Sequence, residues 1–340
     1  MLYEIRLCRH DELDLLKLFI EKSWSDTHIF LKNQLILDFQ HKSLNSYNFV
    51  VAFHKKKKCF HGVLGIISSN FYIHRKISQR DDVFLAIWKV DKDLAELKSL
   101  GVDMLEYVVQ QFKPKSISAI GINKNVSMLY KLMGYKIKNM RQWFIPSKVS
   151  NQNNLIAGSV SKIKFILKPK YYAVIMHKDK EPMLKKFLAK KNSKESFLFI
   201  SERYLKHPIY EYKIILIFDK KDKLVASCVG RDVFANDRKA FRLTELIIDN
   251  YSGENYRGVF DEFLYLNNYD YVDFLEFGFD KKIIKGFGFE LCSENLYVPH
   301  LFEPFVKDRV EVVIAYKSKD RFYCTKGDSD LDRPNRINNV

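Results

Sequence analysis

The sequence predicts a mixed α/β (α+β) protein in which two similar domains follow one another. A chain of 340 residues is longer than one ordinary domain, and its 47% of hydrophobic residues can supply two cores. Each half contains two apolar segments joined by a lysine-rich tip, at residues 55–58 and 220–223, which predicts two antiparallel hairpins. Each half then alternates strands with helices, an order typical of a sheet flanked by helices. We therefore predict a tandem duplication.

The first predicted domain spans residues 1–150. Asp11 opens an amphipathic helix after the first strand, and a second apolar segment precedes the hairpin. In order, the expected elements are strand 3–7, helix 11–20, apolar segment 31–39, strands 47–54, 62–69 and 83–89, helix 103–112, strand 119–122, a helix ending at Gly134, and strand 140–145.

The stretch 146–158 is polar and lacks a period, which predicts a linker. The second domain is then expected at residues 158–320. Its predicted elements are strand 171–177, helix 181–190, strands 213–219, 224–231 and 242–249, helix 255–267, strand 271–277, a short helix before 286–289, and strand 310–316. Residues 321–340 are polar without an apolar face, so we expect an extended or disordered tail.

Composition limits the class of protein. No apolar run is long enough to cross a bilayer and the first residues do not have the pattern of a signal peptide, so we expect a cytoplasmic protein without membrane insertion. Five scattered cysteines and nine histidines lack metal-ligand spacing, so we expect no metal. The net charge of +16 indicates either an acidic partner, most readily a phosphorylated small molecule, or lysines spread over a solvated surface.

The stretch SAIGINKNVSMLYKLMGY, residues 118–135, carries the most specific pattern. It predicts a buried strand, a turn, and a helix whose apolar side contains Val126, Leu129 and Leu132. Tyr130 lies off that side, and Gly134 tolerates the left-handed conformation that ends a helix.

This stretch resembles the GNAT acyltransferase superfamily, whose usual form is an Asn, a Tyr seven residues later, and then Leu-Gly-Phe. The matching residues here are Asn123, Tyr130, Met133, Gly134 and Tyr135. The resemblance implies two tandem GNAT-like domains and an acyl-coenzyme A cofactor, most simply acetyl-CoA. It also implies that Tyr130 protonates the coenzyme A thiolate as it leaves, a role that a neutral phenol suits.

The same family binds the coenzyme diphosphate on a loop written Q/R-x-x-G-x-G/A, where backbone amides at a helix start receive phosphate oxygens. The matching stretch is ELKSLG, residues 96–101, in which Glu96 and Ser99 depart from the usual residues. The resemblance implies one set of cofactor-binding residues: Lys98, Ser99, Leu100, Gly101, Val102 and Asn123.

An acceptor amine must lose a proton before it attacks a thioester, so a base or a water chain is needed. His28, near Trp24 and Asp26, is the first candidate, and Glu245, in a predicted strand, is the second. The other candidates are Asp38, Asp91 and His207. Backbone amides of the strand 83–89 would polarise the thioester carbonyl.

The second half lacks the proton donor. Aligning Gly288 with Gly134 places Ile284 where Tyr130 stands and Phe277 where Asn123 stands. We therefore expect coenzyme A to bind the first half only.

The leading interpretation is an N-acyltransferase that moves an acyl group from coenzyme A to the amine of a nucleotide-linked amino sugar. The string GDSDLDRPN, residues 327–335, resembles tails of bacterial surface-polysaccharide biosynthesis proteins, which would place the reaction in capsule or lipopolysaccharide synthesis. Two alternatives stay open. One is an aminoacyltransferase similar to the Fem type, which uses aminoacyl-tRNA, although nucleic acid is the less favoured partner; the other is a non-catalytic, degenerate GNAT binding protein.

Overall fold

The chain forms two compact units, each built around its own sheet. The computed structural model describes residues 2–77, 79–147, 155–158, 169–189, 191, 193–249 and 255–335. Unit 1 comprises residues 1–138, 313–322 and 328–340, and unit 2 comprises residues 139–312 and 323–327. The chain therefore leaves unit 1 before the expected boundary at residue 150. Most of the predicted linker, residues 148–154, lies outside the described residues.

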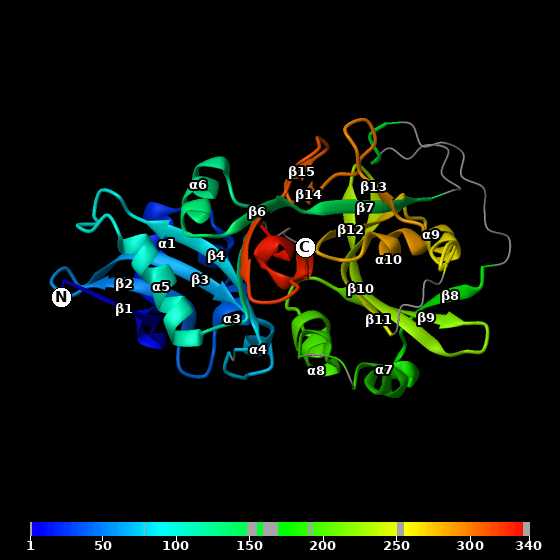
Figure 1. Ribbon diagram of the computed structural model, residues 1–340, viewed down its shortest axis with the longest axis horizontal. Helices are drawn as coiled ribbons and strands as arrows, with labels where there is room; N and C mark the ends of the chain where they lie inside the picture. Colours follow the sequence, from blue (N-terminus) through cyan, green and yellow to red (C-terminus); the bar gives the residue numbers. More distant parts are fainter. Residues whose placement is uncertain are drawn as a thin grey trace. The chain divides into compact units, whose positions relative to one another are not determined.

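Unit 1 contains a seven-stranded sheet (Figure 1). In spatial order its strands are β1 (Tyr3–Cys8), β2 (Tyr47–His54), β3 (Cys59–Ile67), β4 (Asp82–Val90), β5 (Ser116–Ile120), β16 (Val313–Ser318) and β6 (Lys136–Asn139). The pairs β1–β2, β2–β3 and β3–β4 are antiparallel, whereas β4 and β5 run parallel.

Helices cover both faces of this sheet. Each strand contributes side chains to both cores, because successive residues of a strand point to opposite sides. Phe49 and Val51 of β2 pack in one core with α1 (Leu13–Ser23) and α3 (Gln34–His41). Val50 and Ala52 pack in the other with α5 and α6. The bounds of the remaining helices of unit 1 are α2 (Ile29–Lys32), α4 (Ser69–Tyr72), α5 (Leu100–Phe112) and α6 (Lys124–Leu132).

Unit 2 repeats the arrangement. In spatial order its strands are β8 (Tyr171–Ile175), β9 (Tyr212–Asp219), β10 (Leu224–Ala235), β11 (Arg238–Ile248), β12 (Tyr271–Phe277), β7 (Arg141–Pro146) and β13 (Glu290–Leu291). Its helices are α7 (Glu181–Leu188), α8 (Phe197–Ile200), α9 (Asp261–Leu266) and α10 (Lys281–Gly286), and β14 (Leu301–Phe302) pairs with β15 (Phe305–Val306). The parallel pair is β11 with β12.

The two sheets exchange one strand each. Beside β5 of unit 1 lies β16, which comes from the second half of the sequence, and beside β12 of unit 2 lies β7, which comes from the first half. The prediction of a mixed α/β fold with two similar sheets is confirmed. The prediction that strand 140–145 closes the first sheet and strand 310–316 the second is wrong, because each closes the other sheet.

The C-terminal residues also differ from the expectation of an extended or disordered tail. Residues Cys324–Thr325 form β17, which pairs with β12, and two 3-10 turns follow at Lys326–Asp328 and Asp330–Asp332. Lys326 and Asp332 are buried despite their charge. Polar composition therefore did not keep this segment in solvent.

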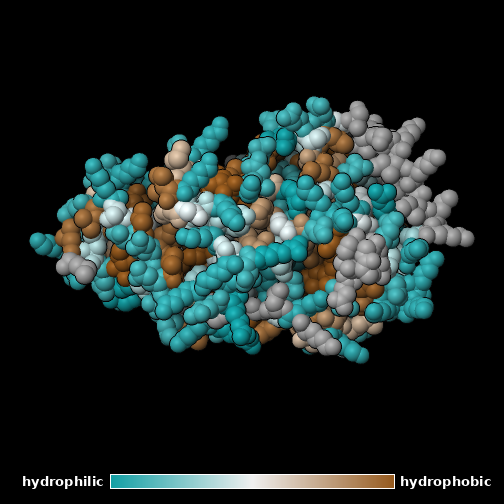
Figure 2. Space-filling model, in the orientation of Figure 1, coloured by the Kyte–Doolittle hydropathy of each residue, from teal (hydrophilic) through white to brown (hydrophobic). Residues whose placement is uncertain are grey.

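Helix α6 is rotated relative to the prediction. Leu132 is 79% exposed and Leu129 37% exposed, whereas Tyr130 is inside the core. Figure 2 shows hydrophobic, brown residues at the surface over α6. Among the described helices, none is both long and apolar enough to span a bilayer.

Candidate functional site

The parallel strands β4 and β5 separate part-way along their length. They pair from Asp82 and Ser116 to Leu85 and Ala119, after which β5 ends and β4 continues to Val90. A bulge lies at this point, because two residue steps along β3 match three along β4. A bulge bends its strand and leaves ladder groups unpaired. The second half of β4 can therefore offer backbone amides to a ligand on the β5 side.

Helix α5 begins beside the far end of β4. The backbone N–H groups of Lys98, Ser99, Gly101 and Val102 donate to no acceptor in the described part of the chain. Free amides at the start of a 13-residue helix favour a bound phosphate, and glycine lets the ligand approach the backbone closely. Leu100 is fully buried and contributes its position in the turn rather than its side chain.

Glu96, which stands where the family has Gln or Arg, fixes the loop before α5. Its carboxylate accepts a hydrogen bond from His54 Nε2 at 3.0 Å and lies 3.2 Å from Lys57 Nζ. Its backbone N–H donates to the hydroxyl of Tyr3 at 3.0 Å. These contacts tie the loop to the β2–β3 hairpin, so this departure from the motif has a structural reason.

Tyr130 packs against the part of β4 that continues beyond its pairing with β5. Its side chain is 1% exposed, with ring centroids 5.3 Å from Trp88 and 5.0 Å from Tyr135. Its hydroxyl has no hydrogen-bond partner among the described residues. Burial raises its pKa well above the ordinary value, so it remains a neutral proton donor at neutral pH.

Trp88 was not predicted as part of this site. Its indole packs on Tyr130 and approaches Gly101, where an added Cβ would lie 3.5 Å from Trp88 Nε1 and 3.4 Å from Val90 Cγ2. Side chains of β4 therefore fill the space directly beside Gly101, and a ligand arm that passes there must displace the indole. An aromatic residue in the strand 83–89 was the available signal for it.

Asn123 has a clear structural task. Its side-chain oxygen accepts a hydrogen bond from the N–H of Val126 at 3.0 Å and so caps α6. A cap of this kind explains the residue type by itself, and the predicted contact with the cofactor remains a prediction.

His28, the first candidate base, lies on the α1–α3 side of the sheet. It caps α2, with Nδ1 accepting from the N–H of Phe30, while its buried Nε2 is unpartnered among the described residues. Burial and the charge of Arg333 lower its pKa to about 3. The imidazole is thus neutral, and because Nδ1 accepts from Phe30, the single ring proton lies on Nε2, which can donate a hydrogen bond but cannot accept one.

The other candidate bases already have partners. Asp38 accepts from Tyr47 at 2.7 Å, and Asp91 accepts from Ser23 at 2.7 Å. Glu245 belongs to unit 2, where the buried carboxylate accepts from Tyr204 at 2.6 Å. His207 accepts two backbone N–H groups at a turn, also in unit 2. The structure therefore places Tyr130 and Gly101 on either side of Trp88 in unit 1, with Val102 in the same unit, and leaves Glu245 in the other unit.

In unit 2 the corresponding opening is occupied by the chain itself. β11 and β12 pair only from Phe241 to Leu243, and beyond that point β17 pairs with Glu276 and Phe277 of β12. Gly327 follows so closely that an added Cβ would lie 3.0 Å from Thr244 Cβ. Ile284, in the place of Tyr130, is fully buried. Among the described residues no cluster of His, Cys, Asp or Glu has the arrangement of a metal site.

Structural comparison shows that this fold is shared with known N-acetyltransferases. The chain is similar to a GCN5-related N-acetyltransferase from Anabaena variabilis, with a TM-score of 0.53 and 10% identity over 94% of this chain and 73% of that one. It is also similar to a protein from Enterococcus faecalis described as a probable N-acyltransferase, with a TM-score of 0.51 and 6% identity over the same shares. No known family profile matches the chain, and no curated sequence matches it.

Proposed function

We propose that the protein is an acyl-CoA-dependent N-acyltransferase whose reaction takes place in unit 1. One observation carries the proposal: a buried, unpartnered phenol, Tyr130, lies where β4 and β5 diverge, in the same unit as the free amides at the start of α5. These are the three groups that acyl transfer from a thioester requires: an anion cradle, a carbonyl-polarising strand and a proton donor.

The residues of the chain divide this work. The amides of Gly101 and Val102, with those of Lys98 and Ser99 in the same turn, hold the diphosphate of the coenzyme, whereas the N–H of Leu100 donates to the carbonyl of Leu97 at 3.3 Å. Backbone amides of β4 beyond the bulge polarise the carbonyl oxygen, and Tyr130 gives its proton to the leaving sulfur. Acyl-coenzyme A, when bound, would supply the activated acyl group, which we take to be acetyl. Asn123 orients α6, and thereby Tyr130, toward the opening.

On the opposite face, the free Nε2–H of His28 can donate a hydrogen bond to an oxygen of the acceptor substrate, because Nδ1 is already bonded to the N–H of Phe30. With its pKa lowered to about 3, the ring orients the acceptor substrate and does not act as the base, so the proton of the amine passes directly to water. Glu245 then has its role in unit 2, where it supports the packing of Tyr204.

We propose a nucleotide-linked amino sugar of bacterial surface-polysaccharide synthesis as the acceptor. The supporting observations are the net charge of +16, which suits a phosphorylated substrate, and the resemblance of the string at residues 327–335. The five cysteines are free thiols, which fits a cytoplasmic enzyme.

A non-catalytic binding protein is the second candidate, and Trp88 is the observation that favours it. The indole fills the space beside Gly101, as it would in a fold that had lost its cofactor. The two candidates differ in whether the phenol of Tyr130 matters for turnover.

The test is an assay of acetyl transfer from acetyl-CoA to UDP-linked amino sugars, in which the released thiol of coenzyme A is measured. Tyr130→Phe should lower kcat by about 100-fold or more and change coenzyme A affinity little, since only the proton donor is lost. Tyr265→Phe, an exposed tyrosine of unit 2, is the matched control and should match the unaltered protein. Equal turnover in both variants would reject Tyr130 as the proton donor.

A further inference from the structure

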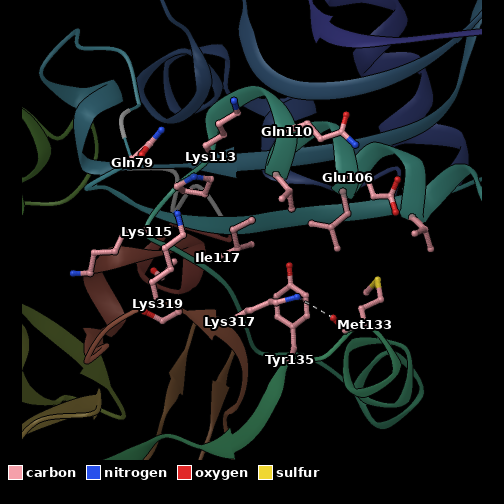
Figure 3. A pocket seen from close by; sticks show the side chains of 16 residues that line it. Gln79, Glu106, Gln110, Lys113, Lys115, Ile117, Met133, Tyr135, Lys317 and Lys319 are labelled. Atoms are coloured by element: carbon pink, nitrogen blue, oxygen red, sulfur yellow. Dashed lines mark hydrogen bonds between the residues drawn. The ribbon is translucent and has the colours of Figure 1, made fainter.

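Unit 1 contains a cavity that the proposed reaction does not use. It has a volume of about 750 Å³ and lies between one side of α5 and the segment from Met133 to Tyr135, with the ends of β5 and β16 below it (Figure 3). Volumes of this size are typical of sites for small organic ligands. Neither Trp88 nor Tyr130 lines it, and of the predicted cofactor-binding residues only Val102 does.

The walls of this cavity are largely apolar. Val102, Leu105 and Val109 form one stripe of α5, because they recur at helical spacing. Ile117 of β5 and Tyr135, which directly precedes β6, line the cavity with them. Val109 is 44% exposed although it is apolar, so this stripe is only partly covered by the protein. The walls can therefore contact a hydrocarbon or ring.

Four lysines line the cavity and only one carboxylate, that of Glu106, does so. Figure 3 shows Lys113, Lys115 and Lys319 toward one end, away from Glu106, while Lys317 reaches over Tyr135. Lys115 lies 4.0 Å from Asp82, but Lys113, Lys317 and Lys319 form no salt bridge with any described residue. The end of the cavity thus carries excess positive charge.

The backbone holds these amines in place. Lys319 N–H donates to the carbonyl of Lys115 at 3.2 Å, so two lysines sit side by side on adjacent segments. In the β5–β16 register Lys317 lies opposite Ile117, and residues opposite each other in an antiparallel pair share a face. The positive charges of the neighbouring lysines, Lys115 and Lys319 above all, repel one another, and a bound anion would remove that repulsion.

We infer that this cavity binds a small phosphomonoester with an apolar body, in a site separate from the cofactor groove. Several lysines suit a phosphate, which carries nearly two negative charges, better than a carboxylate with one. The apolar stripe of α5 receives the body of the ligand. Because Lys317 and Lys319 come from the exchanged strand β16 and the turn after it, the site exists only when the second half of the chain completes the first sheet. The inference does not depend on acyl transfer.

Calorimetric titration of the full chain with hexyl phosphate, inorganic phosphate and hexanol tests it. Hexyl phosphate should bind at least 10-fold more tightly than inorganic phosphate, because the hexyl chain buries apolar surface, and hexanol should not bind measurably. Its affinity should fall as salt is raised, since the ion pairs are exposed.

Two variants separate the two parts of the ligand. Lys317→Gln with Lys319→Gln should weaken hexyl phosphate binding at least 10-fold, whereas Lys220→Gln with Lys221→Gln, at an exposed turn of unit 2, should leave it unchanged. Val109→Trp should remove the preference for hexyl phosphate over inorganic phosphate by filling the cavity. The lysine double variant should melt no lower than the unaltered protein, which checks that it folds.

Equal binding by the two lysine double variants would overturn the site. Competition by desulfo-coenzyme A would overturn its separateness, because it would place the cavity within the cofactor groove. Binding of hexyl phosphate that desulfo-coenzyme A does not displace supports the inference, whether or not acyl transfer is found.

Discussion

Replacing Gly327 with alanine should destabilise the protein by about 3 to 5 kcal/mol. The added methyl group would lie 3.0 Å from Thr244 Cβ and closer still to the hydroxyl of Tyr204. Tyr204 is fully buried and its hydroxyl donates to the carboxylate of Glu245 at 2.6 Å, so it has no room to move without breaking that bond.

The magnitude combines two effects. Overpacking a well-filled core costs about 1 to 3 kcal/mol, and losing a hydrogen bond to a buried charged group costs about 1.5 to 3 kcal/mol. For a unit of this size, each kcal/mol lowers the melting temperature by about 2 to 4 °C. The expected decrease is therefore roughly 10 °C, measured by circular dichroism.

A double-mutant cycle with Tyr204→Phe isolates the cause. Without the hydroxyl, the methyl group meets less of an obstacle, so Gly327→Ala should add only about 1 kcal/mol to the effect of Tyr204→Phe. Additive effects, or an unchanged melting temperature in Gly327→Ala, would show that the C-terminal segment does not fill the opening in unit 2.

The remaining predictions concern buried charged or titratable groups and the proposed coenzyme A site beside Gly101. His28 and His41 have pKa values lowered to about 3 by burial, against about 6.5 in the unfolded chain, so the unfolded state takes up more protons below pH 6.5. The free energy of unfolding in urea should accordingly fall by roughly 2 kcal/mol per histidine between pH 6.5 and 5. This loss should be smaller in His28→Gln but not in His10→Gln. The same dependence of unfolding free energy on pH in both variants would contradict the prediction. Arg242→Met should destabilise unit 2 by about 3 to 5 kcal/mol in thermal unfolding, because it leaves the buried carboxylate of Asp273 without its ion-pair partner. Adding Asp273→Leu should restore most of that loss. A double variant as unstable as the single one would refute the pairing. Trp88→Leu should tighten coenzyme A binding by calorimetry, since the indole no longer has to be displaced, and weaker binding would mean that the indole itself contacts the cofactor.

The fold was predictable where local pattern decides it. The lysine-tipped hairpins and the helix at 103–112 follow from alternation and helical spacing, and they recur in the structure as β2–β3, β9–β10 and α5. The strand exchange was not predictable, because β7 and β16 are both short apolar strands that could close either sheet. The pattern of a short apolar strand does not specify which neighbouring strand it pairs with.

Side-chain packing explains the other differences. Leu132 is apolar at helical spacing yet 79% exposed, because the aromatic contacts of Tyr130 with Trp88 and Tyr135 turn α6 the other way. Asp332 is polar yet fully buried, since the segment that carries it is packed within the fold. Hydropathy assigns both residues to the wrong environment.

The most direct test is the stoichiometry of coenzyme A binding to the full chain, measured by calorimetry. Unit 1 has free amides at the start of α5, whereas β17 occupies the corresponding opening of unit 2. We expect one coenzyme A per chain, with binding lost when Gly101→Pro and Val102→Pro together remove both amide donors. Absence of binding, or binding that survives this double substitution, would contradict an acyl-CoA site in unit 1.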